Sequence, residues 1–332
     1  MKKKYIFLGN GEEWCIESAS LLLTKKNVEF INGFPSKSKF FQSIVKNCYS
    51  NRIPAFIKSF YMPLIHKKAL KNIIFSQETE KRLCVYDWNP LAGDEFFLRK
   101  VRKNYPNIKI AYIFTNVCRI TGAVQQNYID KLNDWYDVVF AFDPEDAKKY
   151  NFGYSPLIYD AKSSYDTSNI QNKENIAFYV GQAKDRLSEL LLCFKRLKTL
   201  GIRTNFHIAN VQEKDIKYQD EIVYNKFMSY DECVNEIQHS SCLIDVIQGD
   251  SAGLTIKTCE AICYDKKLIT TNQHIKEYSF YDPRYIRIIE SPDDIDTAFF
   301  TCNEDVKYSK DAKKYFSAVS FIERLEKELN RK

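Results

Sequence analysis

The stretch that decides the fold is residues 243–272, LIDVIQGDSAGLTIKTCEAICYDKKLITTN. Its pattern predicts a buried strand, a loop of small residues, a helix, a basic turn and a second buried strand. A helix that begins directly after such a loop points unpaired backbone N–H groups and a partial positive charge toward the loop. The stretch therefore predicts an anion site, typically one for a phosphate.

Polar side chains at fixed offsets in this stretch predict contacts to a nucleotide. The loop amides and the Lys257 ammonium would hold phosphates, and Glu260 would accept hydrogen bonds from a ribose hydroxyl pair. Glu260 is three residues beyond Lys257 and so lies on nearly the same helix face. The expected binding residues in this stretch are Ser251, Gly253, Leu254, Thr255, Lys257 and Glu260.

A second loop of the same kind spans residues 181–186, GQAKDR, after a predicted buried strand and at the start of a helix. Gly181 would allow the turn, and Lys184 and Arg186 would point at phosphates from the helix start. An ordinary strand–helix connection with solvated charges is the alternative. Because loops at the carboxyl ends of parallel strands share one edge of a sheet, we expect both loops to converge on one site.

Along the whole chain, short apolar runs alternate with amphipathic stretches, which predicts parallel α/β architecture. The 332 residues suffice for two domains with ordinary cores. We expect two Rossmann-like, doubly wound domains facing a cleft, the first over residues 1–155 and the second over residues 156–309. Residues 310–332 are expected to form a long, charged amphipathic helix.

The cysteines and the apolar runs of the sequence argue against a disulfide-bonded, a zinc-binding or a membrane-spanning protein. The ten cysteines form no CxxC pair and most lie in apolar runs, which favours reduced core thiols over disulfides or a zinc site. The apolar run near the N-terminus is shorter than the ~7–15 residues of a signal peptide or the ~20 of a spanning helix. We therefore expect a soluble, cytoplasmic protein.

Asp293, Asp294 and Asp296 contain a DxD pattern, which helix capping after Ser291-Pro292 explains better than metal binding.

The first predicted domain carries a different loop, Gly9-Asn10-Gly11, followed by Glu12 and Glu13. A dinucleotide fingerprint would need glycine where Trp14 stands, and two acids would repel a pyrophosphate, so no bound cofactor is expected. Glu12, Glu13 or Asp87 could instead act as a general base toward an acceptor. Acid enrichment at a helix N-terminus is the alternative.

Residues 30–77 contain no Asp or Glu and interleave lysines with aromatic residues. Basic and aromatic surfaces suit anionic membranes or nucleic acid. Since no nucleic-acid-binding motif accompanies the stretch, we expect an anionic membrane surface or a lipid-linked acceptor and no nucleic acid. A pair of helices with a solvated basic face is the alternative.

Three segments carry a family resemblance: NIAFYVGQAKDRLSELLLCFKRLKTLGI (residues 175–202), FMSYDECVNEIQHSSCLIDVIQGDSAGLTIKTCEA (residues 227–261) and KKLITTN (residues 266–272). Together they resemble bacterial glycosyltransferases of lipopolysaccharide and capsular polysaccharide synthesis with the GT-B fold. DVVFAFDPEDAKKYNFGYSPLIYD (residues 137–160) looks like the segment that precedes the crossover between domains in that family.

The resemblance implies a hexosyltransferase that needs no metal and takes a nucleotide-diphosphate sugar and a saccharide or lipid-linked acceptor. Lys184 and Arg186 would lie near the diphosphate, the amides of residues 251–255 near phosphate or sugar, and Glu260 at the ribose. It also implies that the last helix packs back on the first domain, and that the protein works at the inner face of the cell membrane. In many retaining members, a first glutamate stands where this chain has Ala252, so the stereochemical outcome stays open.

Two other functions fit the same architecture. One is a phosphotransferase that moves a polyol phosphate onto a polymer, which would need a catalytic histidine facing the phosphate; His66, His207 and His274 are the residues to test. The other is a non-catalytic nucleotide-sugar-binding protein.

Overall fold

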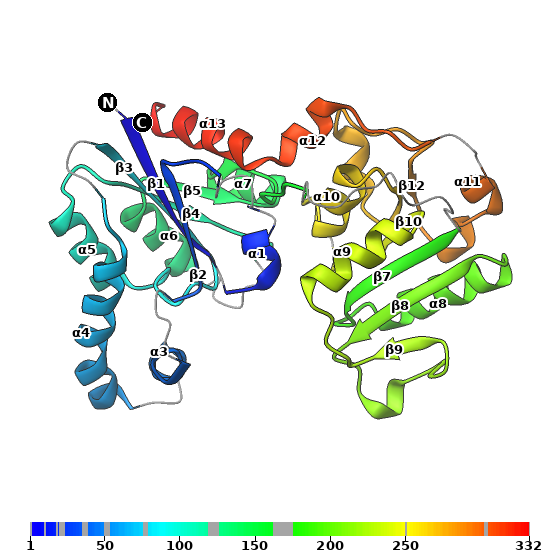
Figure 1. The fold of residues 1–332 in the computed structure, drawn as a ribbon, viewed down its shortest axis with the longest axis horizontal. Coiled ribbons are helices and arrows are strands. Elements are labelled where there is room, and N and C mark those ends of the chain that lie inside the picture. The colour runs from blue at the N-terminus through cyan, green and yellow to red at the C-terminus, as the bar shows by residue number, and fades with distance from the viewer. Residues whose placement is uncertain are drawn as a thin grey trace. The chain divides into compact units, whose positions relative to one another are not determined.

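The structure is a computed structural model. It describes residues 2–9, 11–17, 19, 24–34, 39–49, 54–75, 79–118, 126–161, 175–249, 251–301 and 305–331. The chain divides into two compact units, residues 1–155 with 318–332, and residues 156–317. The sequence of residues 161–174, AKSSYDTSNIQNKE, predicts a polar linker, and residues 162–174 of it lie outside the described residues. Each unit is an α/β layer structure around its own parallel sheet (Figure 1).

The sheet of the first unit has six parallel strands in the order β2-β1-β3-β4-β5-β6. Its strands are β1 (Lys2–Gly9), β2 (Val28–Asn32), β3 (Thr79–Tyr86), β4 (Lys109–Ile113), β5 (Val138–Ala141) and β6 (Gly153–Tyr154). Its described helices are α1 (Glu13–Glu17), α3 (Lys39–Tyr49), α4 (Ala55–Asn72), α5 (Glu95–Asn104), α6 (Gln126–Trp135), α7 (Pro144–Tyr150) and α13 (Ala318–Leu329).

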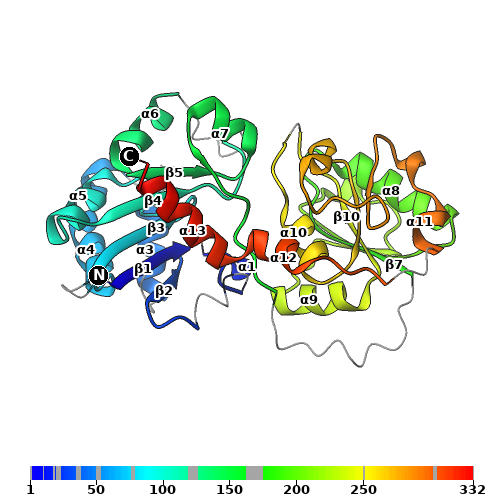
Figure 2. The same ribbon diagram turned by 90° about the horizontal axis from the view of Figure 1, so that it is seen from above.

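Strand β1 shows how this sheet buries both of its faces. Ile6 and Leu8 belong to the core cluster that includes residues of α4, α5 and α6. Phe7, which points to the opposite face because side chains alternate along a strand, meets Phe321 of α13 with ring centroids 5.9 Å apart. Figures 1 and 2 show α13 on one face of the sheet and α4, α5 and α6 on the other. An almost continuous apolar strand is what such double coverage requires.

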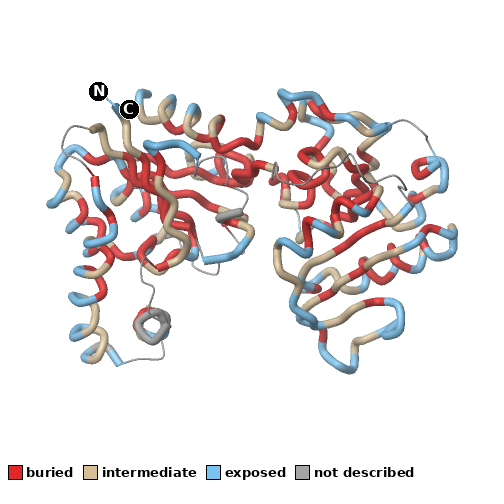
Figure 3. Tube along the Cα trace, viewed as in Figure 1, coloured by how far each residue is buried: buried red, intermediate tan, exposed pale blue. Residues whose placement is uncertain are grey.

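The second unit repeats the plan with strand order β12-β11-β10-β7-β8-β9, again all parallel. Its strands are β7 (Ile176–Gln182), β8 (Arg203–Ala209), β9 (Ile222–Tyr224), β10 (Cys242–Asp245), β11 (Lys267–Thr270) and β12 (Ile286–Ile288). Its helices are α8 (Leu187–Thr199), α9 (Tyr230–His239), α10 (Ile256–Cys263), α11 (Thr297–Thr301) and α12 (Lys310–Phe316), with short 3-10 turns η2 (Glu213–Asp215), η3 (Gln273–Glu277) and η4 (Pro292–Asp294). Strands β10 and β11 are buried at every residue, whereas β7 is buried only at Ala177, Phe178 and Tyr179 (Figure 3).

The strand order places a topological switch point between β7 and β10. From β7 the chain moves outward to β8 and β9, then returns beside β7 at β10 and moves the other way to β11 and β12. Helices after β7 and β10 therefore leave the sheet on opposite faces, which opens a crevice at the carboxyl ends of those two strands. Ligands of open α/β sheets bind at such crevices.

The two doubly wound sheets confirm the expected fold class. Edge strands β6 and β9 were not expected, because each is only two or three residues long. The single long helix expected from residue 310 is broken in two: Ser317 has extended backbone angles, φ −60° and ψ 148°, so α12 stays with the second unit and only α13 joins the first. Among the described residues, no helix is both long and apolar enough to cross a membrane.

Candidate functional site

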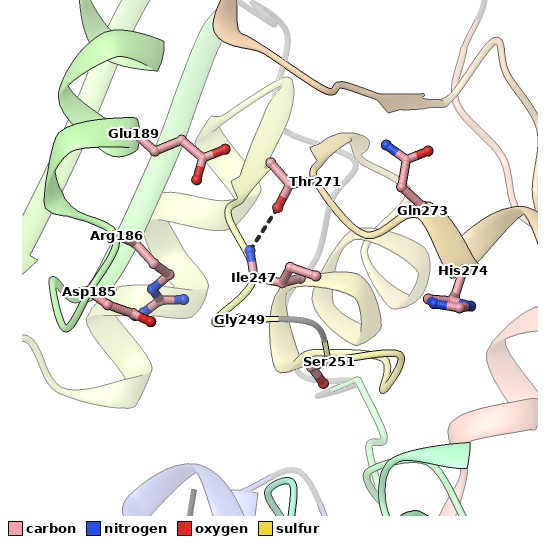
Figure 4. A pocket seen from close by; sticks show the side chains of 9 residues that line it. All are labelled: Asp185, Arg186, Glu189, Ile247, Gly249, Ser251, Thr271, Gln273 and His274. Atoms are coloured by element: carbon pink, nitrogen blue, oxygen red, sulfur yellow. Dashed lines mark hydrogen bonds between the residues drawn. The ribbon is translucent and has the colours of Figure 1, made fainter. Parts of the chain in front are cut away.

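A cavity of about 410 Å³ lies at the switch point of the second unit. Its walls come from three segments, each following the carboxyl end of a neighbouring strand: β7, β10 and β11 (Figure 4). The lining residues are Asp185, Arg186, Glu189, Ile247, Gly249, Ser251, Thr271, Gln273 and His274. The loop after β10 is tied to the loop after β11 by the Ile247 amide, which donates to Thr271 Oγ1 at 2.9 Å (Figure 4).

Arg186 provides the positive charge of this cavity. Its Nη1 donates to the carbonyl of Val246 at 2.6 Å and its Nη2 to the carbonyl of Gln182 at 2.7 Å, which holds the guanidinium between β7 and β10. Its buried Nε has no hydrogen-bond partner within the described structure. No described carboxylate lies within ion-pair distance of the guanidinium. A fixed cation with a free donor and no carboxylate within ion-pair distance suits an anion site, although Asp185 and Glu189 line the same cavity.

The loop after β7 is shaped by two unusual positions. A side chain at Gly181 would place its Cβ 2.9 Å from Tyr179 Oη, so any other residue there would force the Tyr179 ring to shift. Lys184 has a left-handed backbone with φ +49°, and its ammonium donates to Gln248 Oε1 at 2.8 Å. Partial burial and the nearby Arg186 charge lower the pKa of Lys184. The loops at 181–186 and 248–255, which the sequence predicts to converge, are joined by this bond and by Arg186.

The start of α10 is held against the sheet by a buried carboxylate. Asp245, the last residue of β10, has Oδ2 3.1 Å from Thr270 Oγ1 and 3.4 Å from Thr258 Oγ1. Burial raises the pKa of Asp245, and hydrogen bonds from the Thr255 and Thr270 hydroxyls oppose the rise. Thr255 caps the helix, accepting from the Thr258 amide at 3.3 Å. The network fixes where the α10 amides point.

Lys257 and Glu260, both on α10, form a buried ion pair. Lys257 Nζ lies 2.6 Å from Glu260 Oε2, and the two side chains are 10% and 1% exposed. Burial alone would lower the pKa of Lys257, but the Glu260 carboxylate raises it overall, so the ammonium stays charged. On the other carboxylate oxygen, Oε1, Glu260 accepts a long 3.4 Å contact from Tyr230 Oη, which is itself 2.6 Å from Tyr159 Oη.

The expected binding residues fall into two sets, those that line the cavity and those that lie behind its lining. Arg186 and Ser251 line the cavity. Those outside its lining are Gly181, Lys184, Gly253, Leu254, Thr255, Lys257 and Glu260, which lie in the two loops and in α10.

Sequence reasoning missed Glu189, Thr271 and Gln273 as lining residues, and it named His274 only as a candidate for the phosphotransferase alternative. The sequence did contain a signal for Thr271, Gln273 and His274. They directly follow a predicted strand whose carboxyl end lies at the same edge of the sheet as the two predicted loops. Glu189 lies in the first turn of α8, and burial raises its pKa while Arg186 opposes the rise.

The corresponding edge of the first unit is organised by Asn89. Its amide donates to the carbonyls of Gly9 at 2.7 Å and Gly33 at 3.0 Å, which joins the loops after β1, β2 and β3. Glu12 and Glu13 are exposed beside this junction, at the start of α1. The loops at 9–13 and 87–93 are thus brought together, as parallel topology predicts.

Asp87 is the buried acid of that edge. It is 2% exposed; its Oδ1 accepts from Thr115 Oγ1 at 2.5 Å, and its Oδ2 has no partner within the described structure. Burial raises the pKa of Asp87 to about 7, with hydrogen bonds from Thr115 opposing the rise. The next residue, Trp88, is 60% exposed and has φ +63°, a strained conformation for an aromatic residue. Strain of this kind gathers at functional sites, and sequence alone gave no sign of it.

Other sequence-based candidates have structural roles. Ser291 Oγ accepts from the Asp293 amide at 3.1 Å, Asp294 accepts from the Ser291 amide at 2.9 Å, and Asp296 accepts from the Phe299 amide at 2.9 Å. The acidic run at 293–296 therefore caps two turns of helix, as predicted. The nine cysteines within the described ranges are all buried, and none of the nine forms a disulfide. In the described part of the chain, no group of three or more His, Cys, Asp or Glu side chains is arranged to hold a metal ion.

No family model matches the chain, and no curated protein matches it in sequence. Solved structures do match in fold. A trehalose 6-phosphate synthase from Burkholderia multivorans aligns over 100% of this chain and 99% of its own, with a TM-score of 0.54 and 9% identity. A UDP-forming trehalose-phosphate synthase from Burkholderia xenovorans aligns over 99% of both chains, with a TM-score of 0.53 and 11% identity.

The S. aureus MnaA structure with UDP aligns over 99% of this chain and 97% of its own, with a TM-score of 0.51 and 11% identity. The fold is of the GT-B type. At these identities the likeness extends to the fold alone, so the chemistry of this GT-B-type chain has to be argued from its own residues.

Proposed function

We propose that the protein is a glycosyltransferase that moves a sugar from a nucleotide-sugar donor to a saccharide or lipid-linked acceptor. The observation that carries the proposal is the Arg186 guanidinium, which has a free Nε donor and no carboxylate partner at the switch-point cavity. A nucleoside diphosphate supplies the anion that this position lacks. The GT-B-type fold, shared with trehalose-phosphate synthases and with a UDP-bound protein, supports the same class of donor.

The donor would be held both by residues that line the cavity and by residues that lie behind its lining. Arg186 and the amides of residues 251–255 bind the diphosphate, with Lys184 at the rim. Glu260 binds the ribose: among the described residues, its Oε1 has only the 3.4 Å contact to Tyr230, which a ribose hydroxyl could replace at shorter distance. Glu189 and Thr271 offer further acceptors for sugar hydroxyls. Gly181, Gly253 and Leu254 shape the loops, and Lys257 keeps the Glu260 carboxylate charged.

The negative charge that develops on the departing diphosphate can be stabilised without a metal ion. Arg186, Lys184 and the α10 amides present fixed positive charge and donors where the leaving group would sit. We infer a metal-independent hexosyltransferase mechanism from that arrangement. The donor is a substrate, and the proposal includes no bound cofactor.

On the acceptor side, Asp87 is the strongest of the three candidate bases. Its pKa of about 7 and its unpaired Oδ2 suit a group that takes a proton from an acceptor hydroxyl near neutral pH. Exposed Trp88 beside it offers a flat face on which a sugar ring can stack. Glu12 and Glu13 are exposed and remain weaker candidates.

The biological setting is part of the same proposal. We assign the reaction to the synthesis of lipopolysaccharide or capsular polysaccharide, on the resemblance of residues 175–272 to glycosyltransferases of those pathways. The protein would work in the cytoplasm, peripherally at the inner face of the cell membrane. The acid-free stretch at residues 30–77 would face that anionic surface; residues 35–38, 50–53 and 76–77 of it lie outside the described residues.

A thermal-shift screen tests the donor site. UDP and other nucleoside diphosphates, at about 100 times Kd, should stabilise the wild type by ~2.7 kcal/mol. Arg186→Gln should abolish the shift. Lys195→Gln, an exposed charge removal on α8, should keep it. If no nucleoside diphosphate or nucleotide sugar shifts the wild-type melting point, the proposal fails.

One observation favours a second function. Of the three candidate histidines named from the sequence, only His274 is among the residues described as lining the cavity. Its Nδ1 lies 2.9 Å from Glu277 Oε1. A phosphotransferase would use such a histidine. His66 is 3% exposed and paired with Asp94, and His207 contacts Asn205. Loss of turnover in His274→Gln with donor binding retained would favour phosphate transfer, whereas sugar release from a nucleotide sugar by that variant would exclude it. Tight binding without turnover in the wild type would instead indicate a non-catalytic nucleotide-sugar-binding protein.

A further inference from the structure

One face of α4 is apolar in its first half. Phe56, Phe60 and Leu64 are spaced four residues apart, so they lie along one stripe of the helix, and they are 74%, 69% and 48% exposed. Single exposed apolar side chains are ordinary, but a contiguous row of three large ones marks a contact surface. In Figure 1, α4 lies at the outer side of the first unit, next to α5.

The same stripe becomes basic in the second half of α4. Lys67 and Lys71 continue the row at three and seven residues beyond Leu64, and both are exposed. They line a cavity of about 340 Å³ between α4 and α5, whose walls are Pro63, Lys67, Leu70, Lys71, Lys100 and Asn104. No acid lines this cavity, and α4 contains none. Within the described residues, neither Lys67 nor Lys71 forms an ion pair.

Lys100, the third lysine of this cavity, is held in place by a buried relay. Its Nζ lies 3.1 Å from His66 Nδ1, and His66 Nε2 lies 2.6 Å from Asp94 Oδ2, which also accepts from Tyr49 Oη at 2.6 Å. An ammonium can only donate, so Nδ1 accepts and the His66 proton resides on Nε2, facing Asp94. The Asp94 side chain is 5% exposed and does not line the cavity.

Three lysines gathered around one cavity repel each other unless an anion lies among them. We infer that the α4 stripe and the α4–α5 cavity together dock on an anionic lipid bilayer, with lipid phosphates among Lys67, Lys71 and Lys100, and with Phe56, Phe60 and Leu64 in the acyl boundary. Basic and aromatic residues on neighbouring parts of one helix are the combination that binds such an interface.

The bilayer fits both halves of the stripe, and other occupants fit only one. A free phosphate would satisfy the lysines but leave the three apolar side chains in water. In a symmetric pair of copies, a shared patch would bring two sets of lysines together with no acid between them. This inference deepens the membrane partner in the proposed function and rests on that proposal for its biological role, but the test below uses no donor and no turnover.

Vesicle flotation with the full chain tests the inference. Wild-type protein should float with vesicles of equal parts phosphatidylglycerol and phosphatidylcholine, and not with phosphatidylcholine alone. Lys67→Glu with Lys71→Glu should weaken binding at least tenfold, since each lysine near an anionic surface contributes to the attraction. Lys25→Glu with Lys26→Glu, the same charge change at an exposed turn of the first unit, is the matched control and should change it less than threefold.

The apolar half has its own pair of variants. Leu64→Ser should weaken vesicle binding, and Leu192→Ser, at a leucine of similar exposure on α8, should leave it unchanged; the two are 48% and 51% exposed. Circular dichroism of each variant checks that it is folded.

Three results would overturn the inference. The first is wild-type protein that ignores anionic vesicles or binds both kinds equally. The second is a melting-point rise with inorganic phosphate alone that depends on Lys67 and Lys71, which would assign the cavity to a free anion. The third is a dimer in solution that Phe56→Ser with Phe60→Ser dissociates, which would assign the stripe to self-association.

Discussion

Asp87 shows how burial changes the chemistry of one carboxyl group. Its Oδ2 finds no partner within the described structure, and its pKa rises from 3.8 to about 7. The unfolded chain ionises this group near its ordinary pKa, whereas the folded protein keeps it protonated until about pH 7. The stability that Asp87 contributes is therefore fully present below pH ~4 and is lost as pH rises through 7.

The size of this loss gives a prediction for Asp87→Asn. A shift of about three pKa units corresponds to ~4 kcal/mol at pH 8. Since asparagine does not titrate, the variant should lose up to that much less stability than wild type between pH 4 and pH 8. Denaturant unfolding at several pH values measures how steeply the free energy of unfolding changes with pH in each protein. Asp134→Asn, at an exposed position, should follow the wild type; a parallel pH dependence for Asp87→Asn would disprove the raised pKa.

The Lys257–Glu260 pair decides how the ribose assignment can be tested. Glu260→Ala would leave the Lys257 ammonium buried without a partner, which should cost ~3–5 kcal/mol of unfolding free energy. Replacing both residues, Lys257→Met with Glu260→Leu, should restore most of that stability, because no buried charge remains. Urea unfolding of the two variants distinguishes these cases. Equal destabilisation by both would show that the pair is not energetically coupled.

That coupling was hidden from the sequence. The offset of three residues correctly places Lys257 and Glu260 on one helix face, and they meet there. The sequence did not show that the pair would be fully enclosed, because the enclosure comes from Tyr230 and Tyr159, which are distant in the chain. Trp88 is a similar case, since no glycine or asparagine stands at this position to mark its positive φ. Donor binding is therefore better tested with Glu260→Gln, which removes charge but keeps an acceptor oxygen.

At the scale of elements, the helix starts were readable because their signals are local. Asp143 before Pro144 predicts the N-terminus of α7, and the Asp143 carboxylate accepts from the amides of Glu145 at 2.9 Å and Asp146 at 3.3 Å. The same holds for Ser229 at α9. Strands β6 and β9 were missed because so few residues carry no periodicity; each is fixed by pairing with a neighbouring strand.

The cap of α7 gives a prediction at this scale. Asp143→Ala should lower the free energy of unfolding by ~1–2 kcal/mol, since two backbone donors lose their acceptor at a buried position. Glu145→Ala, an exposed acid in the same first turn, should cost less than ~1 kcal/mol because only its charge interaction with the helix dipole is lost. Guanidinium unfolding measures both. The reverse order of the two losses would contradict the capping role.

At the scale of the molecule, the alternation of strands and helices predicts two parallel, doubly wound sheets, whereas it predicts neither the strand order, which differs between the two units, nor the positions of the site residues at the switch point. The break at Ser317 was missed because α12 and α13 share one charged, amphipathic pattern across it. What separates them is packing. Lys313 of α12 pairs with Asp265 in the second unit, and Glu326 of α13 pairs with Lys3 and Arg82 in the first.

The assignment of α13 to the first unit can be tested through Phe321. This side chain is fully buried, with its ring 5.9 Å from Phe7 and 5.3 Å from Phe140 between centroids, so Phe321→Ala should cost ~3–5 kcal/mol. All three tryptophans precede residue 136, so their fluorescence reports only on the first unit. The variant should lower the midpoint of the fluorescence transition while UDP continues to stabilise the second unit, if the donor proposal is right.

A mirror variant completes the test independently of any ligand. Phe194→Ala removes a fully buried ring of α8 in the second unit and should shift unfolding followed by circular dichroism while sparing the fluorescence midpoint. Two units with separate cores lose stability separately, since each substitution leaves a cavity in only one of them. If Phe321→Ala spares the fluorescence midpoint, the returning helix does not stabilise the first unit, and its packing on Phe7 and Phe140 is wrong.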